Sequence, residues 1–324
     1  MLTSQIRTHF GIARDWTSAG YFETAHLKQL QADIADAIAA GRLVAISGPV
    51  GAGKTAMIRR LEGQLLQDKR IIVARSLSID KPRVGLPALI TALFLDISKD
   101  PDFKVPKQPE RRERVLQELF AKARKPVVLF IDEAHDLHGH TLNGLKRLVE
   151  TIEAGGGALS VVLIGHPRLQ NDLKRSTMEE IGHRTTKFEF AGLGDQRADF
   201  LDWLLAQCVA EGTDVDDIIT PEARDFLADR LSTPLQFAEH LNRAFTDAYR
   251  LGAGVVTAEI AEETISFGFD DLDARLARYG YTSKALAEQF DARPTEIRHF
   301  LRGKLDPERA DELGTAMRRA GLPI

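Results

Sequence analysis

The chain has a single cysteine, Cys208, among its 324 residues. One thiol cannot form an internal disulfide, so the fold depends on its core, and the composition fits a reducing compartment. Cys208 lies in an apolar stretch with helical spacing, residues 203–209. We therefore expect this thiol to pack in a core and not to act as a reactive group.

Long hydrophobic runs are also missing. A membrane-spanning helix needs about 20 consecutive apolar residues, whereas the longest apolar runs here, 127–131 and 159–164, have the length of strands. Residues 1–7 do not contain the apolar core of a signal peptide. We therefore expect a cytoplasmic protein without a membrane partner.

The sequence has no excess of positive charge, because its formal net charge is -4. Any binding to nucleic acid therefore needs a local basic face and cannot rely on bulk charge. With 44% hydrophobic and 28% charged residues, the composition is that of a globular protein. The length predicts about two to three domains.

Residues 48–55 form a complete G-x-x-x-x-G-K-[ST] motif. In such a loop the backbone N–H groups surround phosphate oxygens, Lys54 reaches the β- and γ-phosphates, and the Thr55 hydroxyl holds Mg²⁺. An apolar run at 43–47 and a helical pattern at 54–66 flank the motif, which favours a phosphate site over an ordinary glycine-rich turn. The candidate nucleotide-binding residues are Gly48, Pro49, Val50, Gly51, Ala52, Gly53, Lys54 and Thr55.

A second candidate element follows the apolar run at 127–131, where Asp132 and Glu133 stand together. We expect Asp132 to contact Mg²⁺ through water and Glu133 to polarise the water that attacks the γ-phosphate. The alternative is an acidic N-cap of a helix. A glutamate directly after the aspartate favours hydrolysis over simple binding of the nucleotide.

Two further residues are candidates for the same reaction. His166 follows the apolar run 159–164, where it can orient the attacking water or simply cap the strand. Arg184 precedes the last strand of the predicted core, so it can reach the nucleotide of a neighbouring subunit and neutralise charge there. Arg175 competes for this role, and a plain surface charge remains the third interpretation.

The fold class is predicted to be α/β. Strands at 43–47, 71–74, 127–131 and 159–164 alternate with helices, which indicates a parallel sheet with helices on both faces. After residue 195 the strand signals fade. The predicted domains are an N-terminal lead-in (1–30), an α/β nucleotide-binding core (31–194), an all-helical lid (195–265) and a C-terminal helical unit (274–324).

The C-terminal unit has the outline of a helix-turn-helix motif. Thr282 or Ser283 can cap a first helix, and Pro294 can open a second one whose apolar face includes Ile297. DNA contact, docking of a protein partner and packing as part of the lid all remain open for this unit. Its candidate DNA-binding residues are Arg293, Arg298, Arg302 and Lys304.

Basic residues within the core are also candidates for sequence-independent contacts to DNA phosphates. The alternative for each is a solvated surface charge. These residues are Lys81, Arg83, Lys146 and Arg147, together with Lys99, Lys104 and Lys107.

Several blocks of the sequence resemble AAA+ ATPases of the ExeA/TniB/TnsC group, whose members include secretion ATPases and transposition regulators such as the target-selecting B protein of phage Mu. The resemblance covers about residues 5–260. It implies an AAA+ core with a helical lid, ATP and Mg²⁺ as ligands, self-association into a ring or filament, and, for the transposition members, assembly on duplex DNA. The blocks that carry it are residues 9–12, 130–137, 141–148, 163–167 and 232–236.

The chain departs from the family pattern at two positions. Residues 233–236 contain no arginine where many AAA+ lids place one against the γ-phosphate, so we expect weak sensing of the nucleotide, or sensing through Gln236. His166 replaces the Asn, Gln, Ser or Thr that is commoner at the end of its strand. Both departures predict slow, partner-stimulated hydrolysis.

The resemblance and the site residues together favour an ATP-dependent regulator of transposition. Such a protein oligomerises on target duplex DNA and recruits a transposase, and ATP hydrolysis drives its disassembly. The alternatives are a secretion-assembly ATPase and a nucleotide-gated DNA scaffold with negligible hydrolysis.

Overall fold

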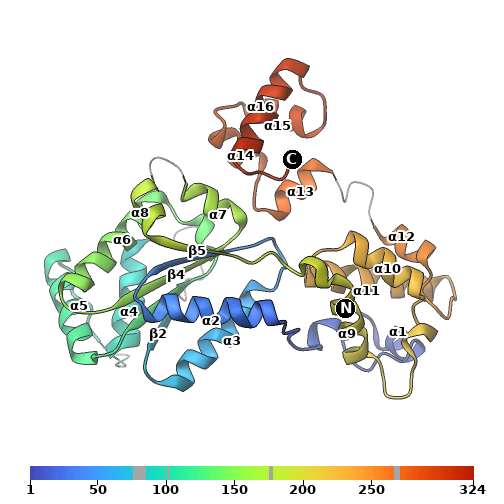
Figure 1. Cartoon of the computed structure of the whole chain (residues 1–324), viewed down its shortest axis with the longest axis horizontal. Coiled ribbons are helices and arrows are strands. Elements are labelled where there is room, and N and C mark those ends of the chain that lie inside the picture. Colours follow the sequence, from blue (N-terminus) through green and yellow to red (C-terminus); the bar gives the residue numbers. More distant parts are fainter. Residues whose placement is uncertain (76–84, 99, 101–102, 175–177, 266–270) are drawn as a thin grey trace. The chain divides into compact units, whose positions relative to one another are not determined.

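The computed structural model describes residues 1–324 except 76–84, 99, 101–102, 175–177 and 266–270 (Figure 1). The chain divides into two compact units. The core unit consists of Thr24–Gly48 and Lys54–Phe190, and the helical unit consists of Met1–Glu23, Pro49–Gly53 and Ala191–Ile324.

The core unit is built on a five-stranded parallel sheet with the strand order β2-β3-β4-β1-β5. Parallel pairing brings the carboxyl ends of all strands to one edge, where Ser47 lies beside Gly165 and Ile131 beside Leu163. The strands are β1 (Leu43–Ser47), β2 (Ile72–Arg75), β3 (Val127–Ile131), β4 (Leu159–Gly165) and β5 (Thr185–Glu189).

Helices cover both faces of this sheet (Figure 1). Every residue of β1, β3 and β4 is buried, which is expected because successive side chains of a strand point to opposite faces. Leu89, Phe94 and Leu145 pack against one face in a single cluster with Leu129 and Val161. The helices of the core unit are α2 (Ala25–Ala39), α3 (Lys54–Asp68), α4 (Leu86–Ser98), α5 (Pro109–Ala123), α6 (Gly139–Ala154), α7 (Pro167–Asp172) and α8 (Glu179–Arg184).

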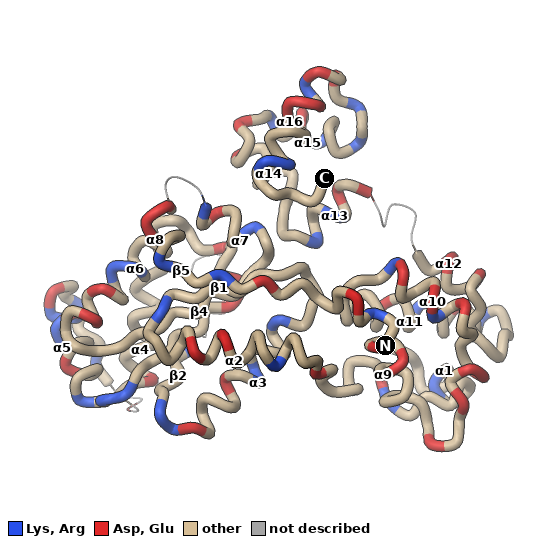
Figure 2. The backbone as a smooth tube through the Cα atoms, in the orientation of Figure 1, with Lys and Arg blue, Asp and Glu red and all other residues tan. Residues whose placement is uncertain are grey.

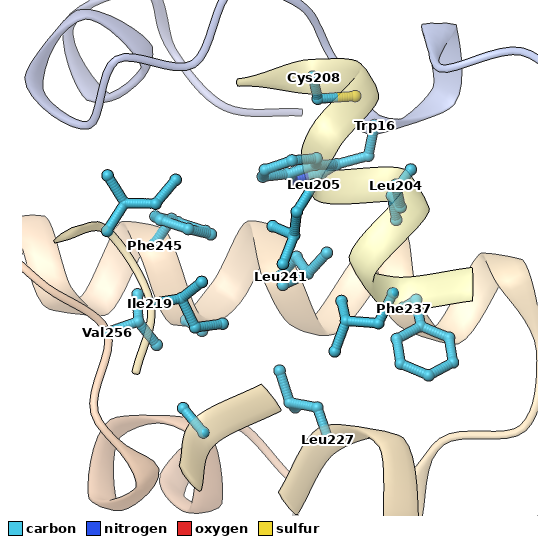
Figure 3. Close-up of a cluster of buried hydrophobic side chains, with 14 of the residues drawn as sticks. Trp16, Leu204, Leu205, Cys208, Ile219, Leu227, Phe237, Leu241, Phe245 and Val256 are labelled. Carbon is cyan, nitrogen blue, oxygen red and sulfur yellow. The ribbon is translucent and has the colours of Figure 1, made fainter. Parts of the chain in front are cut away.

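The helical unit has its own apolar core (Figure 3). The N-terminal helix α1 (Ser4–His9) and the 3-10 turn at Trp16–Ser18 contribute to it, since Phe10 and Trp16 both lie against Phe245, with ring centroids 5.0 and 5.6 Å apart. Cys208 is buried in the same cluster, as the sequence predicts. The main helices are α9 (Arg197–Cys208), α10 (Pro221–Arg230), α11 (Pro234–Arg250) and α12 (Ala258–Thr264), with short 3-10 turns at Gly194–Gln196 and Val215–Asp217.

The C-terminal helices are α13 (Leu272–Arg278), α14 (Ser283–Gln289), α15 (Pro294–Leu301) and α16 (Pro307–Arg319). They share a small cluster that includes Leu286, Ile297 and Met317. The Thr282 hydroxyl caps α14 by accepting a hydrogen bond from the Ala285 N–H at 3.2 Å, and Pro294 opens α15. The predicted α/β fold, a parallel sheet flanked by helices, is confirmed.

Within the described part of the chain, no helix combines the length and the apolar character needed to cross a membrane.

Candidate functional site

Three neighbouring strands deliver the candidate catalytic residues to one edge of the sheet. Gly48 follows β1, Asp132 and Glu133 follow β3, and His166 follows β4, while β3, β4 and β1 are adjacent in the sheet. The carboxyl edge of a parallel sheet is where ligands bind in open α/β folds. The structure therefore gathers residues that lie more than a hundred positions apart in the sequence.

The glycine-rich loop has the backbone that a phosphate cradle requires. Gly51 and Gly53 have φ values of 76° and 101°, a left-handed region that side chains other than glycine rarely adopt. A Cβ atom on Gly48 would lie 2.2 Å from the Phe190 carbonyl oxygen, so this close approach also needs glycine. Helix α3 begins at Lys54 directly after the loop, and its N-terminal N–H groups favour an anion.

Lys54 is held at the same edge. Its ammonium group donates a hydrogen bond to the Gly48 carbonyl oxygen at 2.7 Å. Burial lowers the pKa of Lys54, and the neighbouring carboxylates of Glu133 and Asp132 partly oppose that shift. A half-buried cation beside the loop is suited to bind the β- and γ-phosphates of a nucleotide.

Thr55 and Asp132 line one cavity of about 260 Å³ in the core unit. A hydroxyl and a carboxylate are oxygen donors, which Mg²⁺ prefers in phosphate-binding sites, so the donor set fits this metal. One carboxylate oxygen of Asp132 also accepts a hydrogen bond from the Glu133 N–H at 2.9 Å, which orients the aspartate.

The same cavity contains an ion pair that sequence reasoning missed. The Glu62 carboxylate accepts a hydrogen bond from the Arg75 guanidinium at 2.6 Å, and the Glu62 side chain is only 7% exposed. Burial raises the pKa of Glu62, and Arg75 opposes the shift. The sequence contains only weak signals for this ion pair, since Glu62 lies within a helical pattern and Arg75 ends a short strand.

Glu133 has a left-handed backbone with a φ of 55°. Such a conformation costs a residue other than glycine about 1–3 kcal/mol, and it concentrates at functional sites. It turns the chain into a 3-10 turn at Ala134–Asp136 directly after β3. The turn places His135 beside the carboxylate, with its Nδ1 3.4 Å from Glu133 Oε2.

His166 approaches the same carboxylate from β4, with its Nε2 3.7 Å from Glu133 Oε2. Burial, together with the nearby His135 and Lys54, lowers the pKa of His166 to about 4, although Glu133 opposes the shift. The imidazole is therefore neutral at pH 7. A neutral ring can accept a hydrogen bond from water with one nitrogen and donate with the other.

Arg184 lies away from this group of residues. It ends α8 immediately before β5 begins at Thr185, and Thr185 pairs with Leu43 at the start of β1. Arg184 therefore lies at the amino edge of the sheet, opposite Gly48. Its guanidinium contacts Glu150 at 2.5 Å. The competing candidate Arg175 lies outside the described residues.

The candidate DNA-binding residues differ in their exposure to solvent. Lys146 is buried, and its ammonium contacts the carboxylates of Glu150 and Glu180, so the structure argues against a phosphate contact there and corrects the sequence-based assignment. Lys81, Arg83 and Lys99 fall outside the described residues. The exposed candidates are Lys104, Lys107, Arg147, Arg293, Arg298, Arg302 and Lys304.

Basic and acidic residues are mixed along the C-terminal helices (Figure 2). Arg309, for example, contacts Glu296 and Glu312. The exposed arginines of α15 and of the residues after it therefore form a local basic face at most, in line with the net charge of the chain.

Gln236 acts as a structural cap. Its side-chain oxygen accepts hydrogen bonds from the N–H groups of Ser232 and Thr233 at 2.8 and 3.1 Å, and the Thr233 hydroxyl in turn accepts one from the Gln236 N–H. This capping box begins α11. Because the amide oxygen is already used, the arrangement does not favour Gln236 as a nucleotide sensor.

Comparison with known proteins agrees with this geometry. Residues 38–173, which contain the loop, both acidic residues and His166, match the family model described as an AAA domain. The fold is that of an AAA+ P-loop NTPase.

Solved structures share this AAA+ fold along nearly the whole chain. An ORC2 protein from Aeropyrum pernix in its ADP form has a TM-score of 0.58 at 12% identity, covering 98% of this chain and 90% of its own. Cdc6p from Pyrobaculum aerophilum has a TM-score of 0.53 at 18% identity, with 96% and 90% covered. An ORC1 protein from Aeropyrum pernix in complex with DNA has a TM-score of 0.51 at 16% identity, with 96% and 88% covered.

One curated relative supports the AAA+ assignment from sequence. General secretion pathway protein A from Aeromonas hydrophila is 31% identical over 160 residues. The matched segment covers 49% of this chain and 28% of that protein, so the chain spans well under a third of the relative's length.

Proposed function

We propose that this protein is a slow ATPase that self-associates on duplex DNA and regulates DNA transposition. The observation that carries the proposal is the separation of catalytic groups between two edges of one sheet. Lys54, Glu133 and His166 lie at the carboxyl edge, and Arg184 lies at the amino edge. A complete site then requires a second copy of the chain.

The residues at the carboxyl edge have distinct roles in hydrolysis. The glycine-rich loop and Lys54 bind the β- and γ-phosphates of ATP, and Glu133 polarises the attacking water and accepts its proton. The neutral His166 imidazole orients that water beside Glu133. Thr55 and Asp132 would hold Mg²⁺, which would supply positive charge beside the phosphate oxygens.

The position of Arg184 supports self-association. In a head-to-tail arrangement the amino edge of one subunit faces the nucleotide of the next. The guanidinium of the neighbouring copy then neutralises charge that develops on the γ-phosphate. Hydrolysis removes the γ-phosphate, which both subunits bind, so it weakens the interface and disassembles the oligomer.

DNA binding is supported by exposed basic residues and by similarity to proteins whose structures were solved with DNA. Arg147, Arg293, Arg298, Arg302 and Lys304 are exposed, and one AAA+ structure of the same fold is an ORC1 protein in complex with DNA. A few phosphate contacts per subunit are sufficient, because they repeat along the duplex in an oligomer. The transposase partner rests on the resemblance of the motif blocks to transposition regulators.

The test is a binding titration with a fluorescent duplex of arbitrary sequence. We expect tight, salt-sensitive binding with ATP or a slowly hydrolysed analogue, and much weaker binding with ADP. Lys54→Ala is the matched control, since it should bind equally weakly with every nucleotide. Equal binding of the unmodified protein in the ATP and ADP states would contradict the proposal.

A second candidate is a secretion-assembly ATPase, favoured by the 31% identity to General secretion pathway protein A. The two functions share the catalytic site and differ in the partner. The same titration separates them, because a secretion ATPase has no need for nucleotide-dependent binding to DNA.

A nucleotide-gated DNA scaffold with negligible hydrolysis is the third candidate. Glu133→Gln keeps the size of the side chain and removes the carboxylate that polarises water. A hydrolysing protein should then form persistent oligomers with ATP, whereas a scaffold should behave like the unmodified chain.

A further inference from the structure

The Glu133 carboxylate lies close to two imidazole rings. Glu133, His135 and His166 form a cluster in which one potential ligand atom of each lies within 4.8 Å of the others. The Nδ1 of His135 is 3.4 Å and the Nε2 of His166 is 3.7 Å from Glu133 Oε2. The two rings are adjacent, with centroids 4.0 Å apart.

The fold holds this cluster in place. His166 follows β4 and Glu133 follows β3, and the two strands pair in parallel register. The left-handed backbone of Glu133 and the 3-10 turn after it bring His135 back beside the carboxylate. The His135 and His166 side chains are only 9% and 18% exposed, so the cluster is not a chance meeting of flexible surface groups.

The spacing suits a small transition-metal ion. Zinc binds imidazole nitrogen and carboxylate oxygen at 2.0–2.2 Å, so tetrahedral ligand atoms lie about 3.3–3.5 Å apart. The two distances to Glu133 are close to this value and need only small rotations of the side chains. Three protein ligands with an open fourth position are a common arrangement for zinc.

Each of the two rings has one buried nitrogen atom without a hydrogen-bond partner. Among the described residues, neither the His135 Nδ1 nor the His166 Nδ1 has a hydrogen-bond partner, although both atoms are buried. The unpaired Nδ1 of His135 is also the atom that lies 3.4 Å from Glu133 Oε2, and a bound ion would explain why this buried atom has no hydrogen-bond partner.

The surrounding charges permit a cation. Lys54 and Arg168 oppose a positive ion near His135, while Asp132 and Asp136 attract one. Asp136 has a second effect, because its Oδ1 lies 3.7 Å from the His135 Nε2. A carboxylate on the far side of a ligating histidine orients the ring and raises its affinity for metal.

We propose that Glu133, His135 and His166 bind a zinc ion, which withdraws Glu133 from catalysis and represses the ATPase. The site is distinct from the Mg²⁺ position, because Mg²⁺ prefers oxygen ligands and imidazole favours zinc-like metals. Repression rests on the proposed ATPase function, whereas binding of the metal does not.

Metal binding is tested first on the full chain without nucleotide. Titration with Zn²⁺ should show one site per chain, and Co²⁺ should give the visible absorption of a tetrahedral complex. His135→Ala and the milder His135→Asn should each weaken Zn²⁺ binding by about 10-fold or more. Zn²⁺ affinity that is unchanged in both variants would overturn the proposal.

The chain offers a matched control in a second histidine pair. His138 and His140 are exposed and stacked, with ring centroids 5.0 Å apart, a few residues from the cluster. The double variant His138→Ala/His140→Ala should bind Zn²⁺ as the unmodified chain does. Loss of binding in this variant, with binding kept in His135→Ala, would assign the metal to the surface pair and refute the site.

Repression is tested by phosphate release with Mg²⁺ and ATP. Zn²⁺ should inhibit the unmodified protein, a chelator should restore activity, and His135→Ala should turn over ATP without inhibition by Zn²⁺. Equal inhibition of His135→Ala would refute repression through this site. If no variant hydrolyses ATP, the proposed function fails, and the nucleotide-free titration still decides the metal site.

Discussion

The position of Arg184 predicts complementation between two inactive variants. Arg184→Ala removes the arginine and keeps the phosphate site, whereas Lys54→Ala damages the phosphate site and keeps the arginine. Each variant alone should have little ATPase activity. An equal mixture should regain activity, because an Arg184→Ala subunit can receive the arginine of a Lys54→Ala neighbour.

The structure sets the expected magnitude. β1 has five residues between its two ends, which at about 3.3 Å per residue spans roughly 13 Å. Arg184 lies beyond one end of β1 and the glycine-rich loop lies beyond the other. The guanidinium therefore cannot reach the phosphates of a nucleotide bound to its own chain. Loss of an arginine supplied by a neighbour reduces turnover by about 10³-fold or more.

Random mixing then fixes the recovered activity. In a 1:1 mixture about a quarter of the head-to-tail interfaces pair an intact phosphate site with an intact arginine. We therefore expect about a quarter of the unmodified rate, measured as phosphate release at saturating ATP and constant total protein. The recovery should disappear on dilution below the concentration at which the oligomer forms.

The control for this experiment is Arg42→Ala. Arg42 is also exposed and lines the same hollow as Arg184, and we give it no role in catalysis. Because the contact between Arg184 and Glu150 is exposed, its removal should cost at most about 1 kcal/mol of folding stability. Full activity of Arg184→Ala alone, or a mixture no more active than its components, would refute the reasoning.

Three further predictions concern stability and DNA. Gly48→Ala should lower the melting temperature and the ATP affinity, because its Cβ would lie 2.2 Å from the Phe190 carbonyl oxygen. Gly63→Ala, in open space within α3, should instead stabilise the protein by about 0.5–1 kcal/mol. Equal melting temperatures of the two variants by calorimetry would contradict this prediction. Burial raises the pKa of the Cys208 thiol to about 11, so a thiol reagent at pH 8 should label it only after unfolding, and stability should fall as the pH rises from about 9 to 11 because the unfolded thiol ionises first. Rapid labelling of native protein would refute its burial. Arg298→Ala/Arg302→Ala should weaken duplex binding and reduce the slope of log K against log salt by about 1–2, whereas Arg319→Ala on α16 should not.

Local patterns were sufficient to predict most of the core from the sequence. The strands predicted at 43–47 and 127–131 match β1 and β3. One short apolar run precedes a glycine-rich loop and the other precedes an acidic pair, and few other structures fit these patterns. The two motifs also identify Lys54, Thr55, Asp132 and Glu133. Their meeting at one edge follows from parallel pairing alone.

The remaining features depend on contacts that no local pattern encodes. The sequence does not predict that His135 lies beside Glu133, because this position arises from a left-handed backbone at a residue other than glycine. Lys146 looked like a surface cation, and its burial depends on acidic residues of α6 and α8. The N-terminal residues join the helical unit through Phe10 and Trp16, whose partners lie more than two hundred residues away.

In the proposed function, ATP controls assembly on DNA and hydrolysis ends it. The most direct test is electron microscopy of Glu133→Gln with duplex DNA and ATP, compared with the same sample in ADP. We predict continuous or ring-shaped oligomers on the duplex in ATP, persisting for longer than those of the unmodified protein, and bare duplex in ADP. Equal coverage of the duplex in ATP and ADP, or isolated monomers in both, would contradict the account.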